Sequence, residues 1–268
     1  MSSSPGATRS PTASILPAAL TLGAVVVAIL GAFLGSGAIG GTSVTEAADG
    51  WLSADATPVA PGGSAFSIWS VIYAGLALYA IWQLTRSARG SGRQRWLRPW
   101  AVASALLNAL WLGAVQLDLL FVSVLVILAL LAVLLRMLLI MISDHPSGWV
   151  EAVLTDGTFG LYLGWVSVAT VANIAAWLAA AGAEGFGGWR WAAAAVIAVA
   201  AATGVGLAVF TRGRIAPALA TSWGIAWIAV ARTEGQWESS LLVWTAGIAA
   251  AVVLATAVAA RLVSRSRP

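Results

Sequence analysis

Residues 119–142 have the sequence LLFVSVLVILALLAVLLRMLLIMI, in which Arg136 is the single charged side chain. A helix that crosses a bilayer needs roughly 20 consecutive apolar residues, so this run predicts a transmembrane helix. Seven other apolar runs along the chain have a similar character. We therefore predict eight spans, over residues 15–39, 64–84, 99–115, 119–142, 158–181, 189–211, 215–231 and 241–262.

The composition supports a membrane protein and excludes two other classes. Of the 268 residues, 60% are hydrophobic and 9% are charged, and the mean hydropathy is +0.91. Ordinary soluble domains carry about 25% charged residues, and disordered chains combine low hydrophobicity with high net charge. The apolar runs lack the alternation that is typical of membrane strands. Because helices satisfy their own backbone hydrogen bonds in lipid, we predict an all-α polytopic transmembrane helix bundle.

The arginines predict the orientation of these spans. The net charge is +4, there is no Lys, and twelve of the fourteen arginines fall on one side of the eight-span arrangement. Cytoplasmic loops are enriched in positive charge, so we predict a multi-pass protein of the cell membrane with both termini cytoplasmic. We do not interpret the positive charge as nucleic-acid binding. Only Arg190 and Arg232 fall on the predicted outer side.

Two connections between the predicted spans each allow two interpretations. The inner connection around residues 86–98 is rich in Arg, so it either faces lipid headgroups or binds an anionic ligand or lipid. The outer segment 40–63 is long and rich in Gly, Ser, Thr and Pro, which suits either a functional lid or a loose solvated linker. Asp156 precedes the 158–181 span and is expected to cap that helix.

Polar and aromatic side chains within the spans indicate a binding site. The chain has fifteen Trp, and two Asn lie inside apolar runs. An Asn amide in a membrane helix either bonds to a neighbouring helix or lines a cavity and meets a ligand. Residues three or four apart share one helix face, and three helices each carry an aromatic or polar stripe of this kind. The candidate ligand-binding residues are Trp69, Tyr73, Asn108, Trp111, Trp165, Ala169 and Asn173.

These stripes carry a family resemblance. The residues Trp69-x-x-x-Tyr73-x-Gly75-x-Ala77-x-Tyr79-x-x-Trp82, Asn108-x-x-Trp111 and Tyr162-x-x-Trp165-x-x-x-Ala169-x-x-x-Asn173 resemble three helix motifs of the tryptophan-rich sensory protein family (TspO/MBR, the translocator protein family). The resemblance implies a five-helix unit over residues 1–181, followed by a three-helix transmembrane extension over 182–268. It also implies a hydrophobic ligand, such as a porphyrin or a sterol-like molecule, held between the second, third and fifth spans under the first loop.

The sequence departs from the family pattern in two places. Ser67 and Leu161 stand where prolines are expected, and Phe66 is one position away from its expected place. The small-residue motif Gly31-x-x-x-Gly35 in the first span serves either packing within the bundle or a homodimer.

Chemistry beyond ligand binding finds little support in the sequence. The chain has no Cys and one His, His145, in a predicted inner loop, and we predict neither a catalytic site nor a metal site. The expected function is therefore that of a non-enzymatic sensor, carrier or regulator whose partners are membrane lipid and a hydrophobic small molecule. The alternative is a transporter or permease-like protein without an intramembrane charge relay. No cofactor is expected with certainty, although a porphyrin is a candidate ligand.

Overall fold

A computed structural model describes residues 15–35, 44–183 and 187–266. Within these residues the chain forms eight long helices and no strand, so the all-α polytopic fold is confirmed. The long helices are α1 (Leu16–Gly35), α2 (Ile68–Trp82), α4 (Gly92–Gln116), α5 (Leu120–Ser143), α7 (Thr158–Ala180), α8 (Trp189–Phe210), α9 (Ile215–Ala231) and α10 (Ser240–Arg265).

Short helical turns make up much of the connecting chain. They are the 3-10 turns η1 (Ala48–Gly50) and η2 (Gly63–Ser67), the short helices α3 (Arg86–Gly90) and α6 (Trp149–Glu151), and the π-helical turn η3 (Ala152–Gly157). The predicted third span starts at Pro99, whereas α4 starts at Gly92. Ser91 caps this earlier start by accepting a hydrogen bond from the backbone N–H of Gln94 at 3.3 Å. Pro99 consequently lies inside α4 instead of in its first turn.

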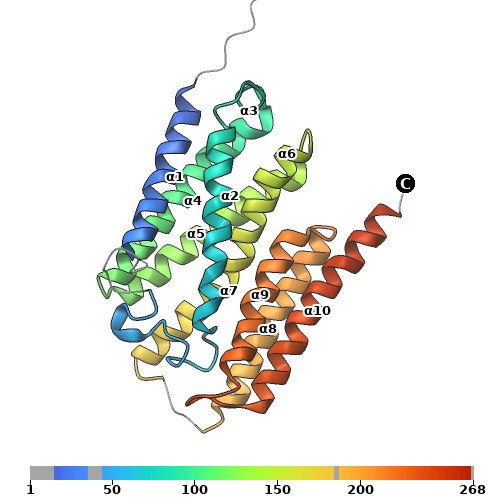
Figure 1. The fold of residues 1–268 in the computed structure, drawn as a ribbon. Helices are drawn as coiled ribbons and strands as arrows, with labels where there is room; N and C mark the ends of the chain where they lie inside the picture. Colours follow the sequence, from blue (N-terminus) through green and yellow to red (C-terminus); the bar gives the residue numbers. More distant parts are fainter. Residues whose placement is uncertain (1–14, 36–43, 184–186, 267–268) are drawn as a thin grey trace, which may run out of the picture.

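The helices run side by side in one bundle (Figure 1). α4 packs against α1 and α5, α7 packs against α5 and α9, and α10 packs against α8 and α9. α1 begins and α10 ends at the same end of the bundle, where α3 also lies (Figure 1). We call this the arginine-rich end, because the described arginines at or near it are Arg86, Arg89, Arg93, Arg95, Arg98, Arg136, Arg212, Arg214, Arg261 and Arg265.

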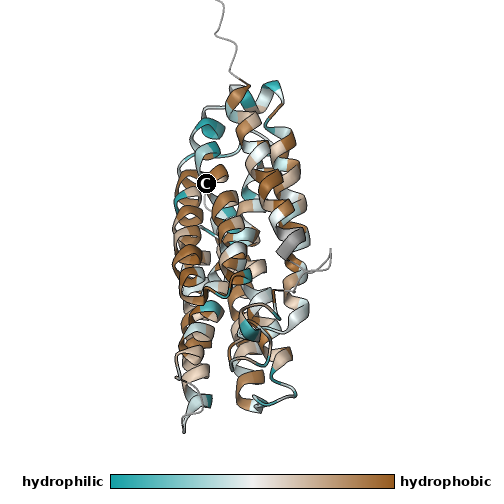
Figure 2. Cartoon of the chain, turned by 90° about the vertical axis from the view of Figure 1, so that its left-hand side faces the viewer, coloured by the Kyte–Doolittle hydropathy of each residue, from teal (hydrophilic) through white to brown (hydrophobic). Residues whose placement is uncertain are grey.

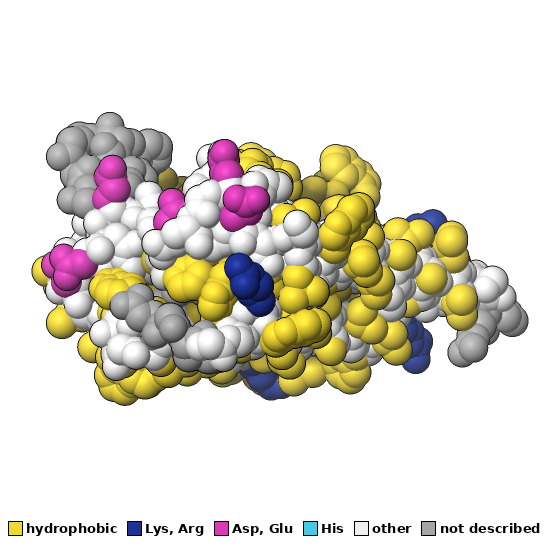
Figure 3. All heavy atoms as spheres, turned by 90° about the horizontal axis from the view of Figure 1, so that it is seen from below, with side chains coloured by type: hydrophobic (Ala, Val, Ile, Leu, Met, Phe, Trp, Pro, Cys, Tyr) yellow, Lys and Arg dark blue, Asp and Glu magenta, His cyan; other side chains and the backbone are white. Residues whose placement is uncertain are grey.

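The opposite end carries most of the acidic side chains, and we call it the acidic end. Figure 3 shows acidic side chains gathered on that face. Its described acids are Glu46, Asp49, Asp55, Asp118, Glu234 and Glu238. Arg9, Arg267 and Glu184, which the sequence also assigns to a side, lie outside the described residues. The two ends therefore differ in charge in the way that the arginine count predicts for the two sides of a membrane.

The helices that form the lateral surface of the bundle carry mostly hydrophobic residues (Figure 2). Five described helical segments are long and apolar enough to cross a membrane: residues 63–82, 120–143, 149–180, 189–210 and 240–265. Leu16–Gly31 and Ile215–Ala231 are shorter apolar helices. Large hydrophobic side chains such as Leu125, Val199 and Leu262 are exposed on this surface. An exposed apolar surface of this extent is suited to lipid and unsuited to water.

Two apolar clusters form the core. The larger is built almost entirely from residues before 181, and the smaller is built mainly from α8, α9 and α10. The two clusters meet where α7 packs closely against α9. A Cβ atom added to Gly160 of α7 would lie 2.9 Å from the Cβ of Ala216 in α9. A Cβ atom added to Gly224 of α9 would lie 2.9 Å from the side chain of Val168 in α7. Small residues allow such close helix contacts in membranes. The division of the chain at residue 181 stays a prediction.

A similar contact accounts for Gly31. A Cβ atom added there would lie 3.7 Å from the Cβ of Ala109 in α4, which is ordinary van der Waals contact. The Gly31 position thus packs within the bundle, against α4.

Candidate functional site

A small cavity lies near the acidic end, between α4, α7 and the 40–63 segment. Its volume is about 30 Å³, which is room for about one or two water molecules. Aromatic rings and small apolar side chains form most of its wall. The lining residues are Trp51, Leu52, Ala60, Pro61, Phe66, Trp111, Trp165, Ala169, Ala172 and Asn173.

Trp165 is the most unusual group in this wall. Its side chain is 1% exposed, and its indole N–H has no hydrogen-bond partner among the described residues. The ring is held edge-to-face by Phe66 at 5.6 Å and by Trp69 at 6.3 Å between centroids. A buried donor without a partner costs roughly 1–3 kcal/mol. One residue of the cavity wall therefore carries a buried hydrogen-bond donor that has no partner among the described residues.

Trp111 and Asn173 face the same cavity but are already paired. The indole N–H of Trp111 donates to Asn173 Oδ1 at 2.8 Å, which joins α4 to α7. The Asn173 amide in turn donates to Ser123 Oγ at 2.9 Å, which adds α5 to the group. Both Trp111 and Asn173 are buried. Of the two interpretations of an Asn in a membrane helix, Asn173 therefore fits the first, in which its amide bonds to neighbouring helices.

Trp69, Tyr73 and Asn108 form an adjacent group, and none of them lines the cavity. Trp69 stacks on Tyr73 with 5.2 Å between ring centroids, and Asn108 Nδ2 donates to the Tyr73 hydroxyl at 2.8 Å. Asn108 Oδ1 is buried and has no partner among the described residues. Trp69 is the link between this group and the cavity, through its contact with Trp165.

The 40–63 segment, described from Val44 onward, covers the cavity. It supplies Trp51, Leu52, Ala60 and Pro61 to the cavity wall. Ala60 is 5% exposed, so this part of the segment is packed into the protein. Residues 59–62 of this cover are all buried, so the loose solvated linker does not fit this part of the segment.

A comparison with known families agrees with this geometry. The chain matches the model of a family described as TSPO-like protein, over residues 15–259. The chain belongs to the TSPO-like family. The resemblance that the sequence motifs suggest is thereby confirmed. The match also continues past residue 181 and includes α8, α9 and most of α10. No curated protein and no solved structure matches the chain.

In this TSPO-like protein the structure divides the predicted site residues into two sets. Trp111, Trp165, Ala169 and Asn173 meet at the cavity, whereas Trp69, Tyr73 and Asn108 form the group beside it. The helix-face patterns do not predict the residues that complete the wall. Phe66 stands out in sequence only as a departure from the family pattern, and Trp51 and Pro61 only as part of a candidate lid. The additional lining residues are Trp51, Leu52, Ala60, Pro61, Phe66 and Ala172.

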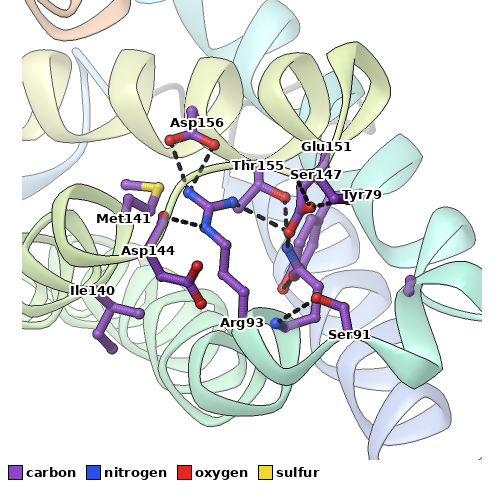
Figure 4. Close-up of polar contacts among 12 residues, drawn as sticks. Tyr79, Ser91, Arg93, Ile140, Met141, Asp144, Ser147, Glu151, Thr155 and Asp156 are labelled. Atoms are coloured by element: carbon purple, nitrogen blue, oxygen red, sulfur yellow. Dashed lines mark hydrogen bonds and ion pairs between the residues drawn. The ribbon is translucent and has the colours of Figure 1, made fainter.

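A second polar group lies at the arginine-rich end, and Figure 4 shows it in close-up. The Arg93 guanidinium donates to both carboxylate oxygens of Asp156 at 2.9 Å and to Glu151 at 3.3 Å. Arg214, the residue that precedes α9, also pairs with Asp156. The side chains of Arg93 and Glu151 are both 3% exposed. These charges join α4, the start of the α6–α7 segment and α9.

The same group corrects two expectations. Asp156 lies within the π-helical turn η3 and forms ion pairs, so it does not cap α7 as predicted. Arg98 is also buried, and its Nε donates to Gln83 Oε1 at 2.7 Å. Neither interpretation of the basic connection therefore fits Arg93 or Arg98, because both face the protein interior. Arg86 and Arg95 are exposed and retain both interpretations.

His145 is exposed and lies in the connection between α5 and α6. In Figure 1, α6 lies toward the arginine-rich end of the bundle. Among the residues that the structure describes, no three His, Asp or Glu side chains are grouped closely enough to hold a metal ion.

Proposed function

We propose that this TSPO-like protein binds a flat hydrophobic molecule, such as a porphyrin, at the Trp165 cavity, and that it acts as a sensor, carrier or regulator without catalysis. The observation that carries the proposal is the buried Trp165 indole N–H, which has no partner among the described residues. Ligand pockets are usually apolar, with a few well-placed polar groups. A carbonyl or carboxylate oxygen of a ligand would satisfy this donor.

The neighbouring side chains favour a flat ligand. Ala169 stands one helical turn from both Trp165 and Asn173 on α7, so a short side chain separates two large ones. Trp111 and Phe66 add aromatic faces to the same wall. Aromatic groups stack on flat ring systems and gain about 0.5–1.5 kcal/mol beyond the area that they bury.

Binding requires the cavity to enlarge. Its volume of about 30 Å³ is far below the roughly 300–1,000 Å³ of ordinary ligand pockets. The helical walls are packed into the core, so we infer that residues 44–63, the described part of the segment, move aside to admit the ligand. Ligand binding and displacement of this segment are then one event.

The setting that we propose is the cell membrane, with both termini in the cytoplasm. The charge difference between the two ends supports this orientation, because arginine-rich connections are retained on the cytoplasmic side. The cavity would then open toward the outer side, and the buried Arg93 group would lie on the inner side.

A titration with protoporphyrin tests the proposal. Porphyrin added to the purified protein in detergent should quench its Trp emission, and the quenching should reach saturation. Trp165→Leu should weaken binding by roughly 1–3 kcal/mol, the scale of a lost aromatic contact. Unchanged affinity in a folded Trp165→Leu variant would place the site elsewhere.

A further inference from the structure

The three C-terminal helices hold the cover of the cavity in place. Arg232, at the C-terminal end of α9, is fully buried. Its guanidinium donates to the backbone carbonyls of Thr57 at 2.9 Å and of Ala54 at 2.6 Å. Both acceptors belong to the 40–63 segment. Burial lowers the pKa of Arg232 from its ordinary value, and the nearby Asp55 carboxylate opposes that shift.

Further bonds join the same two parts of the chain. Gln236 Nε2 and Trp237 Nε1 both donate to the Asp55 carbonyl, at 3.0 and 2.8 Å. The N–H of Gly62 donates to the Trp227 carbonyl at 3.1 Å. A Cβ atom added to Gly62 would lie 3.2 Å from the Trp227 ring and 3.6 Å from the Trp227 carbonyl oxygen, so the segment approaches α9 closely here.

Apolar packing reinforces these bonds. Val59, which lies between the bonded residues Thr57 and Gly62, belongs to the core cluster of α8, α9 and α10. Trp223 of α9 donates its indole N–H to the Ala65 carbonyl of η2 at 3.0 Å. The segment thus presents Ala60 and Pro61 to the cavity while its neighbouring residues are fixed to the C-terminal helices.

We propose that α9 and the α9–α10 connection form a latch that keeps residues 44–63, the described part of the segment, closed over the cavity, with Arg232 as its main positioning residue. The latch itself follows from the contacts above. Its role in ligand exchange rests on the proposed function, because only a ligand that enters this cavity would be controlled by it. Movement of the segment away from α9 breaks the two Arg232 hydrogen bonds. Hydrogen bonds from a charged group are stronger than those between neutral groups.

Arg232 also departs from the charge rule in an informative way. It is one of two arginines on the side that the positive-inside pattern leaves poor in positive charge. Arg190 is the other, and it is exposed, with its guanidinium 4.8 Å from the centre of the Trp189 ring. Arg190 therefore provides a matched control: the same residue type, at the same end of the bundle, without a bond to the described residues of the segment.

The test uses the absence of Cys from the native chain. A single thiol is introduced as Ala60→Cys, a buried position in the cavity wall, and its reaction with a water-soluble maleimide is timed. Adding Arg232→Met should accelerate labelling by about tenfold or more, because two charged hydrogen bonds are lost. Adding Arg190→Met should leave the rate within about twofold, since surface changes have small effects.

Two further variants separate opening of the segment from unfolding. Ala105→Cys, buried within α4, reports global opening and should stay slow in the Arg232→Met background. If labelling of Ala105→Cys becomes fast, Arg232→Met has unfolded the protein. Labelling of Ala60→Cys is then measured in the double variant Gln236→Ala/Trp237→Phe, which removes two bonds to the segment from less buried residues. Equal Ala60→Cys labelling with and without the latch bonds, in folded protein, would overturn the latch.

Porphyrin exchange separates the latch from the proposed function. We expect protoporphyrin to associate and dissociate faster in Arg232→Met than in Arg190→Met. Faster thiol labelling in a protein that binds no porphyrin supports the latch and contradicts the proposed function. Faster labelling with unchanged porphyrin exchange overturns the role of the latch in ligand access.

Discussion

At the scale of single residues, two Trp side chains on one cavity wall differ in a single hydrogen bond. Trp111 donates to Asn173, whereas the Trp165 N–H has no partner among the described residues. Trp→Phe removes a similar ring volume at either position, so the loss of stability from the space left behind should be similar in the two variants. The difference between the two variants therefore isolates the hydrogen bond.

We expect ligand-free Trp111→Phe to be less stable than ligand-free Trp165→Phe by about 1 kcal/mol, because Asn173 Oδ1 loses a donor. Thermal melting in detergent measures the difference. Saturating porphyrin should stabilise wild type more than Trp165→Phe, since tighter binding adds more stability. Equal melting temperatures for the two ligand-free variants would contradict the bonding that distinguishes them.

At the scale of the helices, a buried ion group fixes the arginine-rich end. Arg93 near the start of α4 meets Glu151 and Asp156 on the segment that leads into α7. Arg93→Met removes one positive charge from beside the largely buried carboxylates of Glu151 and Asp156. Breaking a buried pair in this way typically costs about 3–5 kcal/mol.

The neighbouring Arg95 is exposed, so Arg95→Met should change stability by no more than about 0.5 kcal/mol. Melting temperatures of the two variants in detergent, at one pH and ionic strength, give the comparison. A similar small loss for both variants would mean that the Arg93 group contributes little to holding α4 and α7 together.

The helices also show which parts of the fold the sequence could predict. Long apolar runs predicted α9 over the residues that it occupies, and α5, α7 and α8 to within a residue or so at each end. The start of α4 was missed because Arg93 and Arg98 were interpreted as loop residues facing headgroups or an anionic ligand. Their partners, Asp156 and Gln83, are distant in sequence, and no local pattern reveals such pairing.

The candidate site shows the same limit. Residue spacing on single helices brought together Trp165, Ala169 and Asn173, because positions four apart share a face. The cover was visible only as an unusual composition, since Ala60 and Pro61 reach the cavity through the tertiary fold. The sequence does single out Arg232, because it is one of only two arginines on the predicted outer side of the membrane.

At the scale of the whole molecule, the eight-span arrangement that the sequence predicts determines which connections lie on the same side of the membrane. Single Cys substitutions at Ser87, Thr233 and Ser266 are all at exposed positions of a Cys-free chain. In intact cells, a membrane-impermeant maleimide should label Thr233→Cys and should spare the other two until the membrane is opened. Labelling of Ser87→Cys and Thr233→Cys from the same side would contradict the eight-span arrangement.

The central claim is that a flat hydrophobic ligand occupies the Trp165 cavity, and filling that cavity tests it most directly. Ala169→Leu places extra carbons in its wall, whereas Ala192→Leu places them in a separate apolar pocket beside Trp189 and Trp237. The measurement is an equilibrium titration of both variants and wild type with protoporphyrin, followed by Trp emission. We predict that Ala169→Leu weakens binding at least about tenfold, which is roughly 1.4 kcal/mol, the lower part of the usual overpacking cost. Ala192→Leu should bind as wild type does. Wild-type affinity in a folded Ala169→Leu variant would contradict the claim.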